Sequence, residues 1–109
     1  MHLDEHGPGY RVWSTATGQR IEQRMEVATC YMRVRLEASD LAMRHAEQQV
    51  LEDAHDRASS RTDEPIIPPK LSEWQEEDIT DDEGMVVGRV LVIYARAYYW
   101  PRIPEEVDT

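Results

Sequence analysis

Residues 39–58 read SDLAMRHAEQQVLEDAHDRA, and this stretch decides the fold that the sequence predicts. Small or apolar side chains recur in it at every fourth position, which is the spacing of one face of an α-helix. They are Ala42, Ala46, Val50, Ala54 and Ala58. Ser39 or Asp40 can accept hydrogen bonds from the free amides of a first turn, so a helix is expected over about 40–57. A stripe of such small residues lets the helix lie close against a sheet.

Stretches on both sides of this helix have the composition of β-strands. Residues 10–14 alternate, and residues 85–100 are rich in β-branched and aromatic side chains, with a bulge or bend expected at Gly88. Residues 20–37 are ambiguous, because their second half alternates like a half-buried strand whereas their first half fits a helical period. We favour a strand for this stretch, but residues 15–28 stay open between helix and strand.

The part of the chain after the main helix predicts a connection and a second helix. Three prolines make residues 59–71 a proline-rich connection. Ser72 and Gln75 have the spacing of a capping box, which predicts a short acidic helix through about Asp78. The expected fold class is therefore α+β: a small antiparallel β-sheet with one main helix packed across it and a second short acidic helix. The chain, 1–109, is expected to form a single domain with flexible ends at 1–9 and 102–109.

The charge balance restricts the classes of partner. The chain has 22 Asp and Glu against 12 Lys and Arg, a net charge of −10. Nucleic acid and anionic membranes repel such a chain, so we expect no direct nucleic acid and no membrane partner, but rather a basic protein. No apolar run is long enough to span a bilayer, and Cys30 has no second cysteine to pair with. A cytoplasmic location is the simplest expectation.

Catalytic and metal-binding patterns are weak in this sequence. Cys30 lies on the apolar side of its alternating stretch and is expected to be a buried small hydrophobe. Glu52 and His55 have the Glu-x-x-His spacing of di-iron bundles, and His45 precedes them, but such sites need further ligand-bearing helices. We therefore expect no catalytic residue, no metal and no cofactor, and a protein that is not an enzyme.

The acidic run from Glu73 to Glu83 is the main candidate for binding a partner. It holds seven acids and no base, and acids on a short helix and loop can imitate the phosphates of nucleic acid. Trp74 would anchor the contact, and the aromatic cluster around Trp100 would either close the core or present a binding or dimer surface. The predicted partner-binding residues are Glu73, Trp74, Glu76, Glu77, Asp78, Asp81, Asp82, Glu83, Tyr98 and Trp100.

One segment resembles a known group of proteins. The residues from Tyr31 to Asp40, YMRVRLEASD, followed by the small residues of the helix, resemble the strand-to-helix unit of small phage-encoded proteins, including some anti-CRISPR proteins. The resemblance covers residues 27–55 and implies a fold and a phage source, with no catalytic residues. It favours an acidic, phage-type inhibitor that acts in the host cytoplasm and mimics nucleic acid to block a basic nucleic-acid-binding protein. The alternative is a homo-oligomeric structural or assembly protein, a homodimer for example, that pairs through the 85–100 strand.

Overall fold

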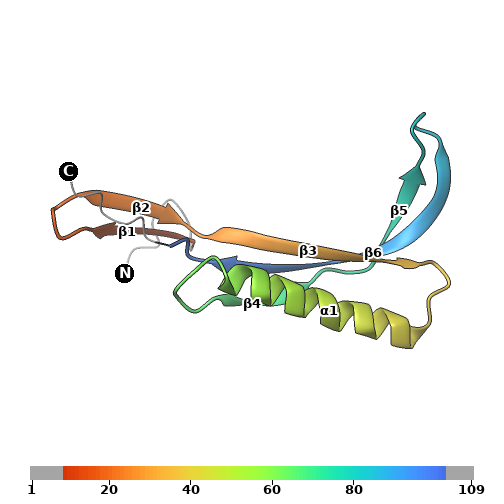
Figure 1. Ribbon diagram of the computed structural model, residues 1–109, viewed down its shortest axis with the longest axis horizontal. Helices are drawn as coiled ribbons and strands as arrows, with labels where there is room; N and C mark the ends of the chain where they lie inside the picture. The colour runs from red at the N-terminus through yellow and green to blue at the C-terminus, as the bar shows by residue number, and fades with distance from the viewer. Residues whose placement is uncertain (1–8, 103–109) are drawn as a thin grey trace.

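The computed structural model describes residues 9–102, which form seven regular elements (Figure 1). They are β1 (Tyr10–Ser14), β2 (Arg20–Arg24), β3 (Glu26–Arg35), α1 (Asp40–Ser59), β4 (Ile67–Leu71), β5 (Gln75–Thr80) and β6 (Val86–Tyr99). The strands form antiparallel sheets of two and four strands. The predicted mixture of an antiparallel sheet with one main helix is therefore confirmed. Of the predicted flexible ends, residues 1–8 and 103–109 lie outside the described residues.

β1 and β2 form a hairpin of their own, beyond one end of the larger sheet (Figure 1). The turn between them needs Gly18, whose φ of +84° lies in the left-handed region that other residues rarely adopt. The Thr15 hydroxyl accepts a hydrogen bond from the Gln19 amide at 3.0 Å and closes the turn. The strand predicted over residues 10–14 is confirmed.

The ambiguous stretch before the helix is entirely extended. β2 ends at Arg24 and β3 begins at Glu26, and the Met25 amide between them donates to the Gly9 carbonyl at 2.6 Å. β3 then pairs along its whole length with β6, from Glu26 opposite Tyr99 to Arg35 opposite Val90. This long-range pairing decides the structure, because it gives the stretch a ladder of hydrogen bonds that an isolated helical period cannot match.

β6 is the central strand of the four-stranded sheet. β3 pairs with one of its sides, and β4 and β5 pair one after the other with its opposite side. The register with β5 shifts between Ile79, opposite Gly88, and Thr80, opposite Val86. The extra residue at this bulge lies next to Gly88, where the sequence predicted a bulge or bend.

The core lies between α1 and one face of the sheet. Ala46, Val50, Ala54 and Ala58 are buried on the helix, and the Ser39 hydroxyl caps its first turn by accepting from the Ala42 amide at 3.1 Å. The sheet contributes alternate residues of β3 and β6 to the same core: Ala28, Cys30, Ile93, Ala95, Ala97 and Tyr99. Alanines on both surfaces let the helix approach the sheet closely, as its stripe of small residues predicted. Cys30 is buried here, as expected.

The predicted short acidic helix is wrong. Residues 75–80 form the strand β5, and the described chain has no helix there. The Ser72 hydroxyl does not cap a helix, because it accepts from the Tyr94 amide at 3.0 Å and lies within hydrogen-bond distance of the Glu73 carbonyl. Pairing with the exposed side of β6 outweighs the local capping signal, since a strand there satisfies β6 backbone groups that a helix would leave unpaired.

The predicted proline-rich connection is shorter than expected, because Ile67–Leu71 form the edge strand β4. An edge position tolerates proline, which cannot donate to a ladder on its free side. The register with β6 shifts between Ile67 and Lys70, around Pro68 and Pro69. The connection proper thus ends at Ile66.

The molecule is long for its size. Its radius of gyration is 19.2 Å and its extents are 58 × 34 × 29 Å, whereas a compact domain of this length has a radius of about 13 Å. The β5–β6 hairpin projects from one end of the sheet and bends away from the side covered by α1 (Figure 1). Within residues 9–102, no helix is both long and apolar enough to cross a lipid bilayer.

Candidate protein-interaction surface

The predicted partner-binding residues do not gather in one place. Those from Glu73 to Glu83 lie along β5 and in the turn after it, Tyr98 lies on β6, and Trp100 follows β6 at the base of the β1–β2 hairpin. The acidic run and Trp100 are thus at opposite ends of the four-stranded sheet (Figure 1). A single partner-binding patch of all ten residues is not formed.

Three acids of the run are engaged within the β5–β6 hairpin. Arg89 pairs with Glu76 at 2.8 Å and with Asp78 at 3.2 Å. On the other face of β5, Glu77 accepts a hydrogen bond from the Tyr94 hydroxyl at 2.6 Å, which raises the pKa of Tyr94 above its usual value. These carboxylates hold the hairpin together and offer a partner less free charge than the sequence implied.

Asp81 shapes the tip of the same hairpin. Its carboxylate accepts from the backbone amides of Glu83 at 2.9 Å and Met85 at 3.0 Å, and Gly84 takes a φ of +83° in this turn. Asp82 and Glu83 are exposed at the tip. Of the acidic run, the residues best placed to meet a partner are therefore Asp82 and Glu83, together with Glu73, which is exposed in the link between β4 and β5.

Trp74 stabilises the fold through its packing and its hydrogen bond, and only part of its side chain is exposed. Its ring is half-buried against the core, and its Nε1 donates to the Glu47 carboxylate of α1 at 2.7 Å. This bond ties the link between β4 and β5 to the helix. The anchor role predicted for Trp74 would require it to leave that position.

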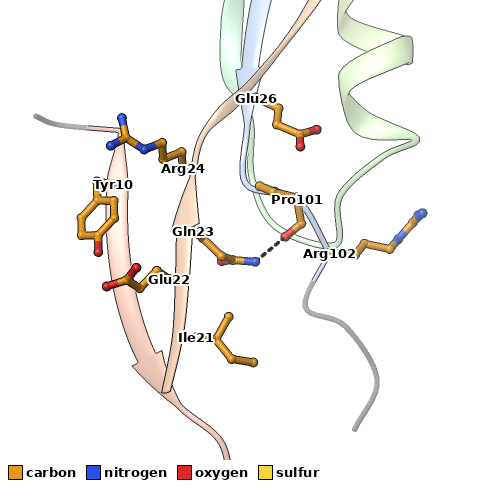
Figure 2. A pocket seen from close by; sticks show the side chains of 8 residues that line it. All are labelled: Tyr10, Ile21, Glu22, Gln23, Arg24, Glu26, Pro101 and Arg102. Carbon is orange, nitrogen blue, oxygen red and sulfur yellow. Dashed lines mark hydrogen bonds between the residues drawn. The ribbon is translucent and has the colours of Figure 1, made fainter. Parts of the chain in front are cut away.

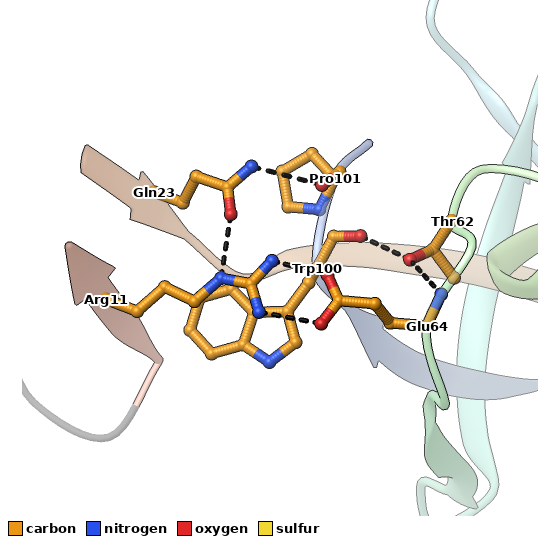
Figure 3. A network of polar contacts seen from close by, with 6 residues as sticks. All are labelled: Arg11, Gln23, Thr62, Glu64, Trp100 and Pro101. Atoms are coloured by element: carbon orange, nitrogen blue, oxygen red, sulfur yellow. Dashed lines mark hydrogen bonds and ion pairs between the residues drawn. The ribbon is translucent and has the colours of Figure 1, made fainter. Parts of the chain in front are cut away.

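Trp100 is part of a joint that fastens the β1–β2 hairpin to the rest of the molecule (Figure 3). The Arg11 guanidinium lies 4.2 Å from the Trp100 ring centroid and forms a bidentate pair with Glu64, with 2.7 Å between Nη1 and Oε1. The pairing raises the pKa of Arg11 and lowers that of Glu64. Gln23 accepts from Arg11 and donates to the Pro101 carbonyl, which completes the joint.

An open pocket of about 560 Å³ lies beside this joint (Figure 2). Its walls carry charges of both signs, Glu22 and Glu26 against Arg24 and Arg102. A hydrogen bond to Glu22 raises the pKa of Tyr10. The pocket is wide open, and its charged groups suit contacts within the hairpin more than the enclosure of a small ligand.

The face of the four-stranded sheet that points away from α1 is uncovered by any other element of residues 9–102. We call it the open face. It consists of the β3 and β6 residues that alternate with the core, together with their neighbours on β4 and β5. Five large side chains on it expose between 42% and 55% of their surface: Val27, Tyr31, Ile67, Ile79 and Tyr98.

The open face is also basic, in a strongly acidic protein. Arg33 lies over the Tyr31 ring at 5.3 Å and Arg96 over the Tyr94 ring at 5.7 Å, and the two rings are 6.0 Å apart. Arg35 and Lys70 add two further charges, and Glu77 is the acid among them. The alternation in the sequence places Tyr31, Arg33 and Arg35 on one side of the strand, but only the sheet order reveals that no described element covers that side.

The outer face of α1 has the opposite charge. Glu52, Asp53 and Asp56 are exposed there, with Arg44 and two histidines, His45 and His55. The Gln48 and Gln49 amides donate to Glu52 and Asp53, one helical turn ahead. Among residues 9–102, no group of three or more His, Cys, Asp or Glu side chains is placed to hold a metal ion.

A comparison of the chain with protein-family models, curated proteins and solved structures finds no match. The predicted resemblance of residues 27–55 to phage-encoded proteins, anti-CRISPR proteins among them, therefore stays a prediction. The exposed apolar and aromatic side chains of the open face are the surface feature that bears most on function.

Proposed function

We propose that this protein is a non-enzymatic, self-associating structural or assembly protein. The open face is the observation that supports this proposal most directly. One face of the sheet packs against a helix, and the other face leaves large side chains exposed to water. Exposed patches of this kind mark surfaces that another molecule covers. The elongated shape adds support, because a lone domain that buries so little of its sheet gains little stability from its own core.

The route of association differs from pairing through the 85–100 strand, which was the alternative prediction from the sequence. From Val90 to Val92 and again from Ala95 to Tyr98, β6 has a strand on each side, so only its Val86–Arg89 end has an edge free for a second copy. A contact through the open face is not limited in this way. The tip of the β5–β6 hairpin, where Met85, Val86 and Val87 are more than half exposed, offers a second apolar contact to an assembling copy.

Removing two tyrosines from the open face should weaken self-association. The double variant Tyr31→Ser/Tyr98→Ser loses two aromatic side chains from the patch, so we expect its dissociation constant for self-association to rise about tenfold or more. Sedimentation velocity across a range of micromolar concentrations measures the change.

The matched control is Val12→Ser, which removes a similarly exposed apolar side chain from the separate β1–β2 hairpin. It should assemble like the wild type. A wild-type protein that stays monomeric at tens of micromolar would exclude the proposed function.

A phage-type inhibitor that mimics nucleic acid in the cytoplasm is the second candidate. The exposed Asp82 and Glu83 at the hairpin tip favour it, together with the net charge of −10. Reversing Glu76 or Asp78 would be a poor test, because it would also break the contacts to Arg89. The tip acids can be changed with less damage to the fold.

The double variant Asp82→Lys/Glu83→Lys tests this candidate. Wild-type protein should release basic proteins that are bound to a DNA-cellulose column, and about tenfold more of the variant should be needed, because the tip would then repel them. Glu37→Lys, at an exposed acid after β3, is the control and should behave like the wild type. If the wild type releases nothing even at low salt, the mimic function is excluded.

A further inference from the structure

We propose that the open face of one copy binds the outer face of α1 of the next copy, so that the protein assembles head to tail. This inference rests on the proposed self-association and names the two surfaces that meet. It follows from three properties of the described residues: their charge, their dimensions and their placement on opposite sides of one layer.

The two surfaces are complementary in charge. The open face carries Arg33, Arg35, Lys70 and Arg96 against Glu77, which is four positive charges and one negative, or +3. The exposed charged residues of α1 are four acids, Asp40, Glu52, Asp53 and Asp56, against Arg44 and Arg57, or −2 with neutral histidines. Juxtaposed patches of opposite sign speed the encounter and fix the register of an interface.

The same charges disfavour two other occupants of the open face. Two copies that met open face to open face would place +3 against +3, and like charges across an interface are costly. Nucleic acid would meet a chain of net charge −10, and the Arg33 and Arg96 guanidiniums already lie over the Tyr31 and Tyr94 rings on which bases would stack. The acidic helix of a second copy meets neither obstacle.

The dimensions of the two surfaces also agree. A helix of 20 residues is about 30 Å long, and β3, with 10 residues, spans about 33 Å. α1 already lies along the sheet of its own copy (Figure 1). A second helix on the open face would repeat this arrangement and give a sheet with helices on both faces.

The placement of the surfaces determines the symmetry. α1 and the open face lie on opposite sides of the same sheet, so each copy offers one surface of each kind. A contact between unlike surfaces is heterologous, and it builds a closed ring or an open filament rather than a two-fold dimer. Because the two surfaces carry opposite charges, the contact should weaken between about 50 mM and about 500 mM salt.

The test uses two charge-reversal variants that each disable one surface. The open-face variant is Arg33→Glu/Arg96→Glu, and the helix variant is Glu52→Arg/Asp56→Arg. All four residues are exposed, so circular dichroism should confirm an unchanged fold. We expect each variant alone to be monomeric where the wild type assembles, and we expect an equimolar mixture to form a heterodimer and nothing larger, because only one pair of intact surfaces remains. A chain that carries all four reversals should assemble again.

Other outcomes separate the failure of this inference from failure of the proposed function. A monomeric wild type excludes both. The head-to-tail contact is wrong, while self-association stands, if the wild type assembles and both charge-reversal variants assemble as well. The same conclusion follows if the helix variant assembles and the open-face variant does not. A fluorescent single-stranded oligonucleotide that binds the wild type, but not the open-face variant, would assign the open face to nucleic acid instead. Arg20→Glu, on the β1–β2 hairpin, is the matched control and should assemble normally.

Discussion

Replacing Ile93 with alanine should lower the free energy of unfolding by about 2–5 kcal/mol. Ile93 lies on β6 in the middle of the core, only 1% exposed, and is among the largest fully buried side chains. The alanines around it cannot move inward to fill the space, because their positions are fixed by the backbones of the helix and the sheet. A cavity should therefore remain, and total stabilities of about 5–15 kcal/mol make such a loss severe.

Urea denaturation followed by circular dichroism measures this loss. Val87→Ala is the control, since Val87 is 64% exposed on the projecting hairpin and its replacement should cost less than about 0.5 kcal/mol. Should Ile93→Ala fail to fold, Ile93→Val gives a graded cost of about 0.5–1.5 kcal/mol. A negligible effect of both would contradict the register of β6, because a slip by one residue turns Ile93 to the open face.

Breaking the joint between the β1–β2 hairpin and the body should release the hairpin without unfolding the sheet. In Arg11→Met the guanidinium that stacks on Trp100 and pairs with Glu64 is lost. The hairpin forms a two-stranded sheet of its own, and such a ribbon is barely stable alone. We therefore expect its amides to exchange with solvent about tenfold faster or more, while those of β3 and β6 are unchanged.

Hydrogen exchange also tests whether the ion pair between Arg11 and Glu64 stabilises this joint. Since the pairing with Arg11 lowers the pKa of Glu64, the stabilisation is present above the ordinary pKa of a glutamate and is lost as the pH falls through the lowered value. Protection of the hairpin should thus decrease in acid, and Glu64→Gln should remove that pH dependence. Arg20→Met, which removes an exposed pair with Glu22 and leaves the joint intact, is the control. If the exchange rates of the β1–β2 amides changed neither in Arg11→Met nor with pH, the proposed role of the joint in holding the hairpin would be wrong.

Local sequence patterns predicted the elements that are stabilised locally. The helix follows from its own residues, because Ser39 caps it and small side chains recur at helical spacing on one face. The strands at residues 10–14 and 86–99 follow from alternation and β-branched side chains. Cys30 was expected to be buried because it shares a side of β3 with Met32 and Val34, and that periodicity holds whatever the strand pairs with.

The misplaced elements are those whose structure depends on distant residues. Ser72 and Gln75 have a helix-capping spacing, yet β6 lies beside them and binds their segment as a strand. Residues 67–71 looked like a linker because of their prolines, but an edge strand accepts prolines that a central strand would not. Both errors have one cause: local sequence patterns do not show which distant strand will pair with a segment.

The sequence alone thus determined the composition of the surfaces, and the tertiary structure decided which of them are free. The excess of acid and the clustering of seven acids between Glu73 and Glu83 are properties of the chain. Pairing with Arg89 and Tyr94 then engages Glu76, Glu77 and Asp78, because β5 lies against β6. The same sheet order leaves the basic, tyrosine-bearing side of β3 and β6 bare, since the single described helix can cover only one of the two faces of a sheet.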